Sequence, residues 1–437
     1  MDMDWKKLYQ EKKHSVEDAV KVIKSGDRIY IGTASSVAYK LCDALYERKD
    51  ELENVTVCHG LLTRVLPFFK EESKGHFSSI SYFAGPGERL GISTGQTQWT
   101  SLSLSQIRLW CKEIARPNVA FLEVSLPDEN GYMSLGAYGP SFHEYVASIA
   151  DVVVLQVNKN VPYVYGENTL IHISDATIVA EADDDLSALP NTPFDDTIKT
   201  LASHIIPLIP DGACLQLGIG GIANAVGYGL KNHTDLGVHT EMLTDSMMDL
   251  MKAGVITNKK KNFMPGKAMT AFAFGSKDLY EFVNHNEDIY FAPFNIVNDP
   301  FVIAKNDNMI SVNTAMSVDL YGQVVADCLG GKQQSAIGGQ VDYVRGSQLS
   351  KGGKSIIALT STLDKKDGSK SSRIVASFPA GTAVTTSRSD VQYVATEYGC
   401  VNLNVLTMPE RAKAMISLAH PSFRDELLAQ AKQFGIL

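Results

Sequence analysis

The sequence predicts an α/β protein made of two similar open α/β domains, related by internal duplication, with the functional site in the cleft between them. Three observations lead to this fold class. Short apolar runs suited to buried strands alternate with segments of helical periodicity. One helix–strand–helix–strand pattern occurs twice, near residues 15–60 and 196–241. An acidic stretch with two prolines, residues 181–197, separates the two copies and is typical of a linker.

The two copies share their glycine spacing. Ile-Lys-Ser-Gly-Asp-Arg-Ile-Tyr-Ile-Gly-Thr begins at Ile23, and Ile-Pro-Asp-Gly-Ala-Cys-Leu-Gln-Leu-Gly-Ile begins at Ile209. Helix, glycine, strand, glycine, helix and strand follow in the same order in both, which indicates a repeated unit. The first copy has Gly60 near the place where the second has Glu241. We therefore expect the chemistry in the second copy and a supporting role for the first.

The first domain is assigned to residues 1–190. Ser15 suits the N-cap of its first helix, and Gly26 ends that helix. The expected elements are a helix at 15–24, a strand at 28–31, a helix at 37–48, and strands at 55–58 and 119–124, followed by a helix at 141–149 and a strand at 151–157.

Residues 81–98 are rich in glycine and are expected to form a loop. Within them, Gly91-Ile-Ser93-Thr-Gly95 fits the G-x-S-x-G pattern of a nucleophilic serine. That site needs a strand directly before the serine and a helix directly after it. A Gly-Pro-Gly segment precedes the motif here, so a surface or cleft-lining loop is the favoured interpretation.

The second domain is assigned to residues 196–437. Its expected helices lie at 196–208, 222–230, 245–253, 409–419 and 422–433. Its expected strands lie at 213–217, 236–239, 269–274, 289–292, 309–312, 323–327, 355–359, 374–376 and 391–396.

Charge and hydropathy exclude several classes of protein. The net charge is −9 and the isoelectric point is about 5.6, so a nucleic-acid partner is not expected. The most basic run, Lys259-Lys260-Lys261, is interpreted as a solvated loop. No run approaches 18 apolar residues, and the N-terminus lacks the apolar core of a signal peptide. We therefore expect a cytoplasmic protein with no membrane partner.

The cysteines and histidines, which commonly bind metals, do not occur in the spacing of a metal site. Six cysteines are scattered along the chain without a C-x-x-C pair, as expected for free, buried thiols in a reducing compartment. The ten histidines form no H-E-x-x-H motif, so no metal site is expected. The cysteines are at positions 42, 58, 111, 214, 328 and 400.

Residues 211–245 are the centre of the second copy. Gly218, Gly220 and Gly221 form a turn without side chains, so a ligand can approach its backbone. Glu241 is expected at the carboxyl end of the next strand, where open parallel sheets bind ligands.

These residues alone leave three interpretations open. Gly218-x-Gly220-x-x-Ala223 with Glu241 near the spacing of a ribose-binding acid fits dinucleotide binding. Glu241 as a nucleophile, beside loop N–H groups that hold an oxyanion, fits acyl transfer. A tight turn with a solvated glutamate needs no function at all.

The rest of the second domain favours acyl transfer. A dinucleotide site needs one glycine turn, whereas this domain has a second glycine pair at Gly338 and Gly339. It also has an amide-rich turn at Asn298 and a second strand-end acid, Glu397. Thioester attack creates an oxyanion that such N–H and amide donors can stabilise.

Nine short motifs, in order, give the chain a resemblance to the family I coenzyme A transferases, in the acetyl-CoA hydrolase/transferase branch. The branch includes 4-hydroxybutyrate CoA-transferase and butyryl-CoA:acetate CoA-transferase, and the resemblance covers nearly the whole chain. The motifs are Asp27 in Ser-Gly-Asp-Arg, Pro127-Asp128 with Asn130-Gly131, Leu215 to Gly220, His239-Thr240-Glu241-Met242, Val297 to Pro300, Val318-Asp319 with Tyr321-Gly322-Gln323, Gly338 to Asp342, Thr385-Thr386-Ser387-Arg388 and Thr396-Glu397-Tyr398-Gly399.

The resemblance implies a role for each matching residue. Glu241 matches the family's nucleophile, which forms an acyl-glutamyl anhydride and then a glutamyl-CoA thioester. Asn298 matches an amide that stabilises oxyanions. The remaining matches are CoA-contacting residues and active-site surroundings. The CoA contacts are Gly218, Ile219, Gly220, Gly221, Ile222, Gly338 and Gly339, and the surroundings are Gln216 and Glu397. The family needs no cofactor beyond CoA as substrate, and it commonly forms homodimers or homotetramers.

Some stretches depart from the family pattern. Cys400-Val-Asn-Leu follows Thr-Glu-Tyr-Gly where relatives have a small residue and a Leu-Arg/Lys-Gly stretch, and no lysine aligns near Thr360. The loops at 33–37 and 61–67, which are expected to face the acyl group, are also unlike those of relatives. The acceptor acid therefore stays open among acetate, butyrate, 4-hydroxybutyrate and a small dicarboxylate such as itaconate.

Two rival functions accompany CoA transfer. An acyl-CoA hydrolase would use the same Glu241, with water resolving the covalent intermediate. A CoA-binding or assembly subunit would have no activity, which the presence of Glu241, Asn298 and Gly339 argues against.

Overall fold

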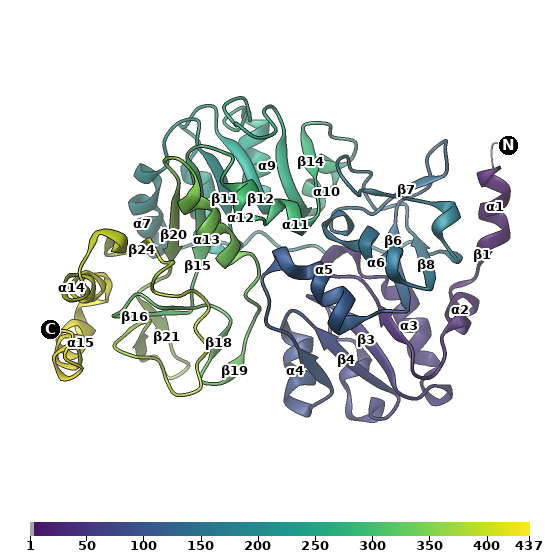
Figure 1. The fold of residues 1–437 in the computed structure, drawn as a ribbon, viewed down its shortest axis with the longest axis horizontal. Helices are drawn as coiled ribbons and strands as arrows, with labels where there is room; N and C mark the ends of the chain where they lie inside the picture. The colour runs from purple at the N-terminus through teal and green to yellow at the C-terminus, as the bar shows by residue number, and fades with distance from the viewer. Residues whose placement is uncertain (1–3) are drawn as a thin grey trace. The chain divides into compact units, whose positions relative to one another are not determined.

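The computed structural model describes residues 4–437, and its backbone contacts divide the chain into two compact units (Figure 1). Unit 1 comprises Met1–Pro190 and Met269–Val297, and unit 2 comprises Asn191–Ala268 and Asn298–Leu437. The first unit breaks at Pro190, where the sequence analysis ended the first domain. The segment 269–297 differs, because the sequence analysis assigned it to the second domain.

Hydrogen bonds explain why the segment 269–297 groups with unit 1. The backbone N–H of His285 donates to the carbonyl oxygen of Tyr163 at 2.7 Å. The hydroxyl of Tyr280 donates to the carbonyl oxygen of Ser187 at 2.6 Å. These contacts join stretches more than 90 residues apart, which periodicity along the chain cannot reveal.

Unit 1 is built on a parallel sheet with the strand order β1-β10-β8-β6-β2-β3-β4-β5. The strands are β1 (Lys13–His14), β2 (Arg28–Tyr30), β3 (Val55–His59), β4 (Phe77–Ser81), β5 (Thr97–Trp99), β6 (Val119–Val124), β8 (Val152–Val157) and β10 (Ile178–Glu181), with the separate pair β7 (Tyr132–Ser134) and β9 (Leu170–His172) and the later strand β14 (Ile289–Phe291). The α-helices are α1 (Trp5–Lys12), α2 (Val16–Ala19), α3 (Tyr39–Glu47), α4 (Pro86–Thr94), α5 (Ile107–Leu109), α6 (His143–Ile149), α10 (Lys277–Val283) and α11 (Phe294–Val297).

Unit 2 is built on a second sheet, in which the strands of this unit follow the order β12-β11-β15-β20-β24-β25. All of these pairs are parallel except β24 with β25. The strands are β11 (Cys214–Leu217), β12 (Gly237–Leu243), β15 (Met309–Thr314), β20 (Lys354–Ala358), β24 (Tyr393–Thr396) and β25 (Gly399–Asn402), while β13 (Ala268–Ala273) begins at the unit boundary. The α-helices are α7 (Asp196–Ile205), α8 (Gly221–Gly229), α9 (Asp245–Lys252), α12 (Pro300–Ile303), α13 (Gln340–Leu349), α14 (Met408–Leu418) and α15 (Pro421–Gln433).

Short strands lie outside the main sheet of unit 2. They form a small sheet of order β17-β16-β23 and two antiparallel hairpins. Figure 1 shows this group below the main sheet in the view. Its strands are β16 (Ser317–Asp319), β17 (Val324–Val325), β18 (Cys328–Leu329), β19 (Lys332–Gln333), β21 (Thr362–Asp364), β22 (Lys370–Ser372) and β23 (Ile374–Val375).

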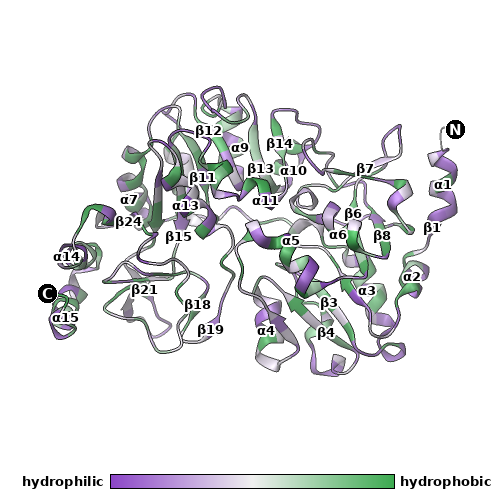
Figure 2. Cartoon of the chain, viewed as in Figure 1, coloured by the Kyte–Doolittle hydropathy of each residue, from purple (hydrophilic) through white to green (hydrophobic). Residues whose placement is uncertain are grey.

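Apolar side chains hold each unit together. Ile29, Val57 and Phe121 are fully buried in the core of unit 1, and Ile357 and Val394 are fully buried in the core of unit 2. Figure 2 shows hydrophobic residues along the central strands. Burying one such side chain stabilises the fold by about 1.5–3 kcal/mol. The buried strand residues therefore hold each sheet in place, and with it the residues at the ends of its strands.

The two sheets confirm the predicted duplication. The compared strands are β3-β2-β6-β8-β10 in unit 1 and β12-β11-β15-β20-β24 in unit 2. When each set is numbered along the chain, both have the spatial order 2-1-3-4-5. Arg28 pairs with Thr56, and Cys214 pairs with Gly237. Because Arg28 and Cys214 are equivalent in the repeated sequence, this register makes Gly60 the structural equivalent of Glu241.

Residues 81–98 correct the expected loop. Pro86 begins α4, and Gly95 ends it with φ +76° in the left-handed region that favours glycine. Gly91 lies against Thr97, where a Cβ atom would be 1.9 Å from the Thr97 hydroxyl oxygen. Ser93 lies inside α4 and donates to the carbonyl oxygen of Leu90 at 2.7 Å. The G-x-S-x-G motif is therefore part of a helix and is not a nucleophile turn.

Other expected elements differ in detail. The expected helix at 15–24 is α2 followed by a 3₁₀ turn, Val20–Val22. Lys259 and Lys260 are exposed, as expected for a solvated loop, whereas Lys261 is only 5% exposed, which corrects that expectation for Lys261. Its ammonium donates to the carbonyl oxygens of Val238 and Lys267, at 2.7 and 2.6 Å, and those bonds replace water. No helix within residues 4–437 is long and apolar enough to cross a membrane.

Candidate active site

Glu241 lies inside β12, whereas the sequence analysis placed it after the end of a strand at 236–239. The strand continues to Leu243, and side chains alternate between its two faces. Glu241 therefore shares a face with His239. Extending the observed pairing of Cys214 with Gly237 places Gly218 level with Glu241. The predicted glycine turn and the predicted nucleophile thus occur at the same edge of the sheet.

Two donors hold the Glu241 carboxylate. The side-chain amide of Asn298 donates from Nδ2 to Oε2 of Glu241 at 2.8 Å. The backbone N–H of Gly339 donates to the same carboxylate. Asn298 is fully buried and directly precedes Asp299, the N-cap residue of α12, and Gly339 is the N-cap residue of α13. Both predicted partners of Glu241 are therefore in contact with it.

Position 339 has no room for a side chain. A Cβ atom there would be 1.9 Å from Glu241 Oε2 and 2.3 Å from Asn298 Nδ2. Gly339 has φ −94°, so its backbone conformation does not require glycine. Close approach to the carboxylate is the reason for glycine at this position.

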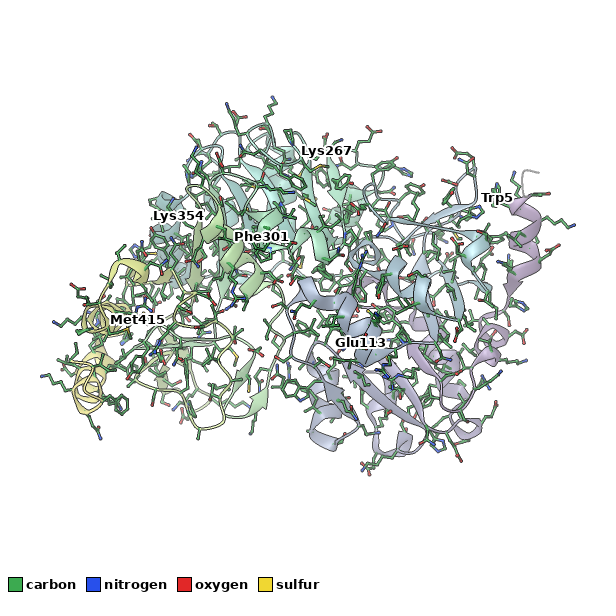
Figure 3. The ribbon with its side chains drawn as sticks, in the orientation of Figure 1. Trp5, Glu113, Lys267, Phe301, Lys354 and Met415 are labelled. Atoms are coloured by element: carbon green, nitrogen blue, oxygen red, sulfur yellow. The ribbon has the colours of Figure 1, made fainter. Side chains whose placement is uncertain are left out.

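The helices α12 and α13 pack closely, which sets the spacing between the two donors. A Cβ atom on Gly346 of α13 would be 2.6 Å from a Cγ atom of Ile303 on α12. Ile303 is fully buried, whereas Phe301 on the other side of α12 is 77% exposed and is labelled in Figure 3. Because Asn298 precedes α12 and Gly339 begins α13, this contact helps to fix both donors against Glu241.

The surroundings raise the pKa of Glu241 to about 7. Burial of the carboxyl group is the largest cause, and the nearby negative charge of Asp342 adds to it. The hydrogen bonds from Asn298 and Gly339 act in the opposite direction, because they favour the ionised form. The carboxyl group is therefore partly desolvated, yet it still has donors aimed at it.

The predicted CoA-contacting loop surrounds the start of α8. Gly220 has φ +95° and is the N-cap residue of α8, and Ile219 is half exposed. The backbone N–H of Gly218 donates to the carbonyl oxygen of Val312 at 3.1 Å. Gly221 packs against the carbonyl oxygen of Pro193. Ile222 lies in the first turn of α8 and is buried. Gly338, in the other glycine loop, has φ +62°.

Gln216 belongs to a buried amide pair on the same face of the sheet. Asn313 Nδ2 donates to Gln216 Oε1 at 3.0 Å, and β15 register places Asn313 level with Gly218. The sequence analysis missed Asn313, although it stands near the end of a predicted strand, as catalytic and binding residues of such sheets do. It also missed the effect of Asp342, which is part of the Gly-Gly-Gln-Val-Asp motif.

Glu397 is not brought next to Glu241. It follows β24, and β20, β15 and β11 lie between β24 and β12. At the usual strand spacing, this places the two strands about 19 Å apart along the sheet. The carboxylate of Glu397 accepts hydrogen bonds from the backbone N–H of Ser361, at 2.9 Å, and from its hydroxyl. Glu397 therefore organises a neighbouring part of the same sheet edge.

A large groove in unit 1 contains none of the predicted site residues. It has a volume of about 920 Å³ and is lined by the segments 125–129, 159–165 and 277–285, with Asp185 and Leu186. Within residues 4–437, no group of three His, Cys, Asp or Glu side chains is arranged to hold a metal ion. Five of the six cysteines are buried, and Cys400 is partly exposed, which departs from the expected buried thiols.

Comparison with known proteins identifies the family to which the chain belongs. Residues 1–210 match the acetyl-CoA hydrolase/transferase N-terminal domain, and residues 275–431 match the C-terminal domain. The chain is 41% identical over 432 residues to a 4-hydroxybutyrate coenzyme A transferase of Clostridium kluyveri, covering 99% of this chain and 100% of that one. It is 39% identical over 443 residues to a butyryl-CoA:acetate CoA-transferase of Anaerostipes caccae, covering 99% of each chain. The crystal structure of RipA from Yersinia pestis matches with a TM-score of 0.93 at 34% identity and covers both chains completely.

The fold and these matches define an enzyme of the CoA-transferase class. The chain belongs to the acetyl-CoA hydrolase/transferase family, which confirms the resemblance found in the sequence. Among the three interpretations of residues 211–245, acyl transfer is therefore favoured over dinucleotide binding and over a turn without function.

Proposed function

We propose that this CoA-transferase moves CoA from a short-chain acyl-CoA to a small free carboxylate, with Glu241 as the covalent nucleophile. One observation carries the proposal: the desolvated Glu241 carboxylate accepts hydrogen bonds from the Asn298 amide and the Gly339 N–H. Two donors that meet one carboxylate are suited to the oxyanions of thioester attack. The names of the relatives support acetate, butyrate or 4-hydroxybutyrate as the acid.

The first half-reaction loads CoA onto the enzyme. We assign Oε1 of Glu241 as the attacking oxygen, because Oε2 is held by Asn298. Attack on the thioester carbonyl forms a carbon–oxygen bond and expels the CoA thiolate, which leaves an acyl-glutamyl anhydride. The thiolate then attacks the glutamyl carbon of the anhydride, forms the glutamyl-CoA thioester and releases the first acid as its carboxylate.

The second half-reaction reverses these steps with another acid. The incoming carboxylate attacks the glutamyl thioester, expels the thiolate and forms a new anhydride. The thiolate attacks the acyl carbon of that anhydride, so the new acyl-CoA leaves and the Glu241 carboxylate returns. When the thiolate attacks the glutamyl carbon, negative charge develops on Oε2, the oxygen that the Asn298 amide already contacts, and the Gly339 N–H donates to the same carboxyl group. The cycle consumes no water, and we propose no cofactor beyond CoA as substrate.

Borohydride trapping tests the covalent intermediate. The enzyme is mixed with acetyl-CoA or butyryl-CoA in the absence of an acceptor acid, and sodium borohydride is added. Reduction of the glutamyl thioester should inactivate the enzyme and change the mass of the peptide that contains Glu241. Glu241→Gln is the matched control, because it keeps the size of the side chain and removes the nucleophile. Equal inactivation with and without acyl-CoA would contradict the proposal.

An acceptor panel identifies the substrate. Acetate, butyrate, 4-hydroxybutyrate and a small dicarboxylate such as itaconate are compared by kcat/KM. For a transferase, one molecule of new acyl-CoA should form for each molecule of donor acyl-CoA consumed. Rapid release of free CoA without any acceptor would instead favour the hydrolase. We further propose a homodimer or homotetramer that acts in the cytoplasm, which light scattering and cell fractionation test.

A further inference from the structure

The segment 334–340, which carries Gly339, is tied at both ends to the same short structure in unit 2. This structure consists of β17 with the following Asp327, and of Thr385 and Thr386, which pair with it. The backbone N–H of Val324 donates to the carbonyl oxygen of Thr386 at 3.0 Å, and the N–H of Thr385 donates back to Val324 at 2.8 Å. We call Asp327, Thr385 and Thr386 the threonine clamp.

Asp327 holds the beginning of the segment. Its carbonyl oxygen accepts from the backbone N–H groups of Gln334, at 2.7 Å, and Ser335, at 3.2 Å. Its carboxylate accepts from the side chain of Gln333 at 3.1 Å and from the hydroxyl of Thr385. Asp327 is only 3% exposed, and its bond with the Thr385 hydroxyl is buried, so that bond is formed away from water and is stronger than a surface bond.

Thr386 holds the end of the segment. The side-chain amide of Gln340 donates to the Thr386 hydroxyl oxygen at 2.9 Å. Thr386 is fully buried, and Gln340 is the first residue of α13, directly after Gly339. A displacement of Gln340 therefore moves the Gly339 N–H directly.

Between these two ends, the segment contains two adjacent glycines that offer little stiffness. Gly338 adopts φ +62°, and Gly339 has no side chain to pack. Glycine is the residue with the greatest conformational freedom, so the ends must supply the order that these positions lack. A shift of 1 Å in a catalytic group can reduce a rate by about 100-fold.

We propose that the threonine clamp is a positioning device for the transferase reaction, which keeps the Gly339 N–H aimed at the Glu241 carboxylate. The inference rests on the proposed function of Glu241 and goes beyond it, because no clamp residue contacts Glu241 in the described hydrogen bonds. It also gives a purpose to the Thr385-Thr386 motif, which the sequence analysis noted without a role.

Thr386→Val tests the clamp, because valine keeps the shape of threonine and removes the hydroxyl. Thr382→Val is the matched control. Thr382 accepts from the N–H of Gly330 at 2.9 Å, at the tip of the β18–β19 hairpin, so this variant removes a threonine hydroxyl that accepts a hydrogen bond, although an exposed one, away from the segment 334–340. Thr386→Ser keeps the hydroxyl and should restore the wild-type behaviour.

A specific kinetic pattern is expected. The kcat of Thr386→Val should fall by about 10- to 100-fold, less than for complete loss of an oxyanion donor. The KM for acyl-CoA should change less than kcat, because the glycine turn at 218–221 is untouched and only the expected CoA contacts at Gly338 and Gly339 lie in the displaced segment. The acid limb of the kcat/KM profile should move to higher pH, because the Gly339 bond favours ionised Glu241 against the charge of neighbouring Asp342. Thr382→Val should behave as the wild type.

Amide hydrogen exchange supplies a measurement that does not depend on activity. Faster exchange in the peptide covering 335–340 is expected in Thr386→Val and not in Thr382→Val. The proposed clamp would be overturned if Thr386→Val had both the kcat and the amide hydrogen exchange of the wild type. It would also be overturned if the loss of kcat disappeared when rates were normalised to folded protein. If the wild-type enzyme did not transfer CoA between acids, the proposed function would be wrong. Amide hydrogen exchange would still show whether Thr386 orders the segment 335–340.

Discussion

The two copies of the repeated unit have different side chains at the equivalent edge of their sheets. In unit 2, Glu241 on β12 is a carboxylate whose pKa is raised to about 7 by burial. In unit 1, the equivalent position is Gly60, and the ring of Tyr82 occupies the space beside it. A Cβ atom on Gly60 would be only 2.3 Å from that ring. One copy therefore presents a reactive group, and the other fills the same place with an aromatic side chain.

Hydrogen bonds show the same contrast. The Tyr82 hydroxyl is 2.9 Å from the Thr33 hydroxyl, which lies 3.1 Å from the Tyr30 hydroxyl. The Tyr30 hydroxyl is 2.8 Å from Nε2 of His143, and burial lowers the pKa of His143 to about 3, which keeps this ring neutral. Neutral groups satisfy one another in unit 1, whereas in unit 2 the donors converge on a charge. The lesson is that strand order provides the position and that the local donors decide whether it is reactive.

Glu241→Ala makes the second copy resemble the first, and it should have the largest effect. Removal of a covalent nucleophile is expected to lower the rate of CoA exchange on the order of 10⁴-fold or more. The thermal unfolding midpoint should stay close to that of the wild type. Exchange rates measured with isotopically labelled acid check the loss, and unchanged turnover would remove Glu241 from the mechanism.

Gly339→Ala tests the close approach to the carboxylate. Its Cβ atom would lie 1.9 Å from Glu241 Oε2, so the loop must move and take its N–H away. Loss of one oxyanion donor costs about 100- to 1,000-fold in kcat. Steady-state kinetics with a folding check by circular dichroism measure it. Full activity would mean that the loop tolerates a side chain beside Glu241.

The pH profile sharpens the electrostatic part of the comparison. The nucleophile must be ionised, so kcat/KM of the wild type should fall about tenfold per pH unit below a pH of about 7. Asn298→Ala removes a hydrogen bond that lowers the pKa of Glu241, so the acid limb should move to higher pH. A limb that stays in place or moves to lower pH would argue against Asn298 as a donor to the ionised carboxylate.

Gly60→Ala tests the first copy and should affect stability more than chemistry. Overpacking against Tyr82 is expected to lower the free energy of unfolding by about 1–3 kcal/mol. Urea denaturation measures the loss. Adding Tyr82→Ala should recover part of the overpacking cost in a double-mutant cycle, and purely additive effects would show that the two sites are independent.

Ser93→Ala should have the smallest effect. The Ser93 hydroxyl bonds within α4, to the carbonyl oxygen of Leu90, so its loss should change stability by less than about 0.5 kcal/mol. The rate of CoA exchange should equal that of the wild type. A large loss of activity would revive the serine nucleophile that the helix argues against.

Local patterns were enough to predict the scaffold. The paired glycines around 26–32 and 212–218 predicted the duplication. The strand that contains Glu241 was also predicted, although its predicted end, His239, lies two residues before Glu241. The contact of Glu241 with Asn298 and Gly339 joins positions 57 and 98 residues away along the chain. No periodicity encodes such distances, so only the resemblance to a family could place these three residues together.

The incorrect predictions have a common physical cause. Residues 81–98 contain four glycines and were interpreted as a loop, but the contact of Gly91 with Thr97 makes glycine useful inside a helix. Lys261 was interpreted as solvated, but the carbonyl oxygens of Val238 and Lys267 replace its water. In each case a partner distant in sequence overrides the local preference.

The missing side chain at position 339 has a consequence for comparing genomes. A chain that retains glutamate at the position of Glu241 but has any larger residue in place of Gly339 would force a Cβ atom onto the carboxylate. Such a sequence is not expected to keep the covalent geometry, however similar it is elsewhere. The pair of glutamate and glycine, examined together, is therefore a better marker of an active family member than the glutamate alone.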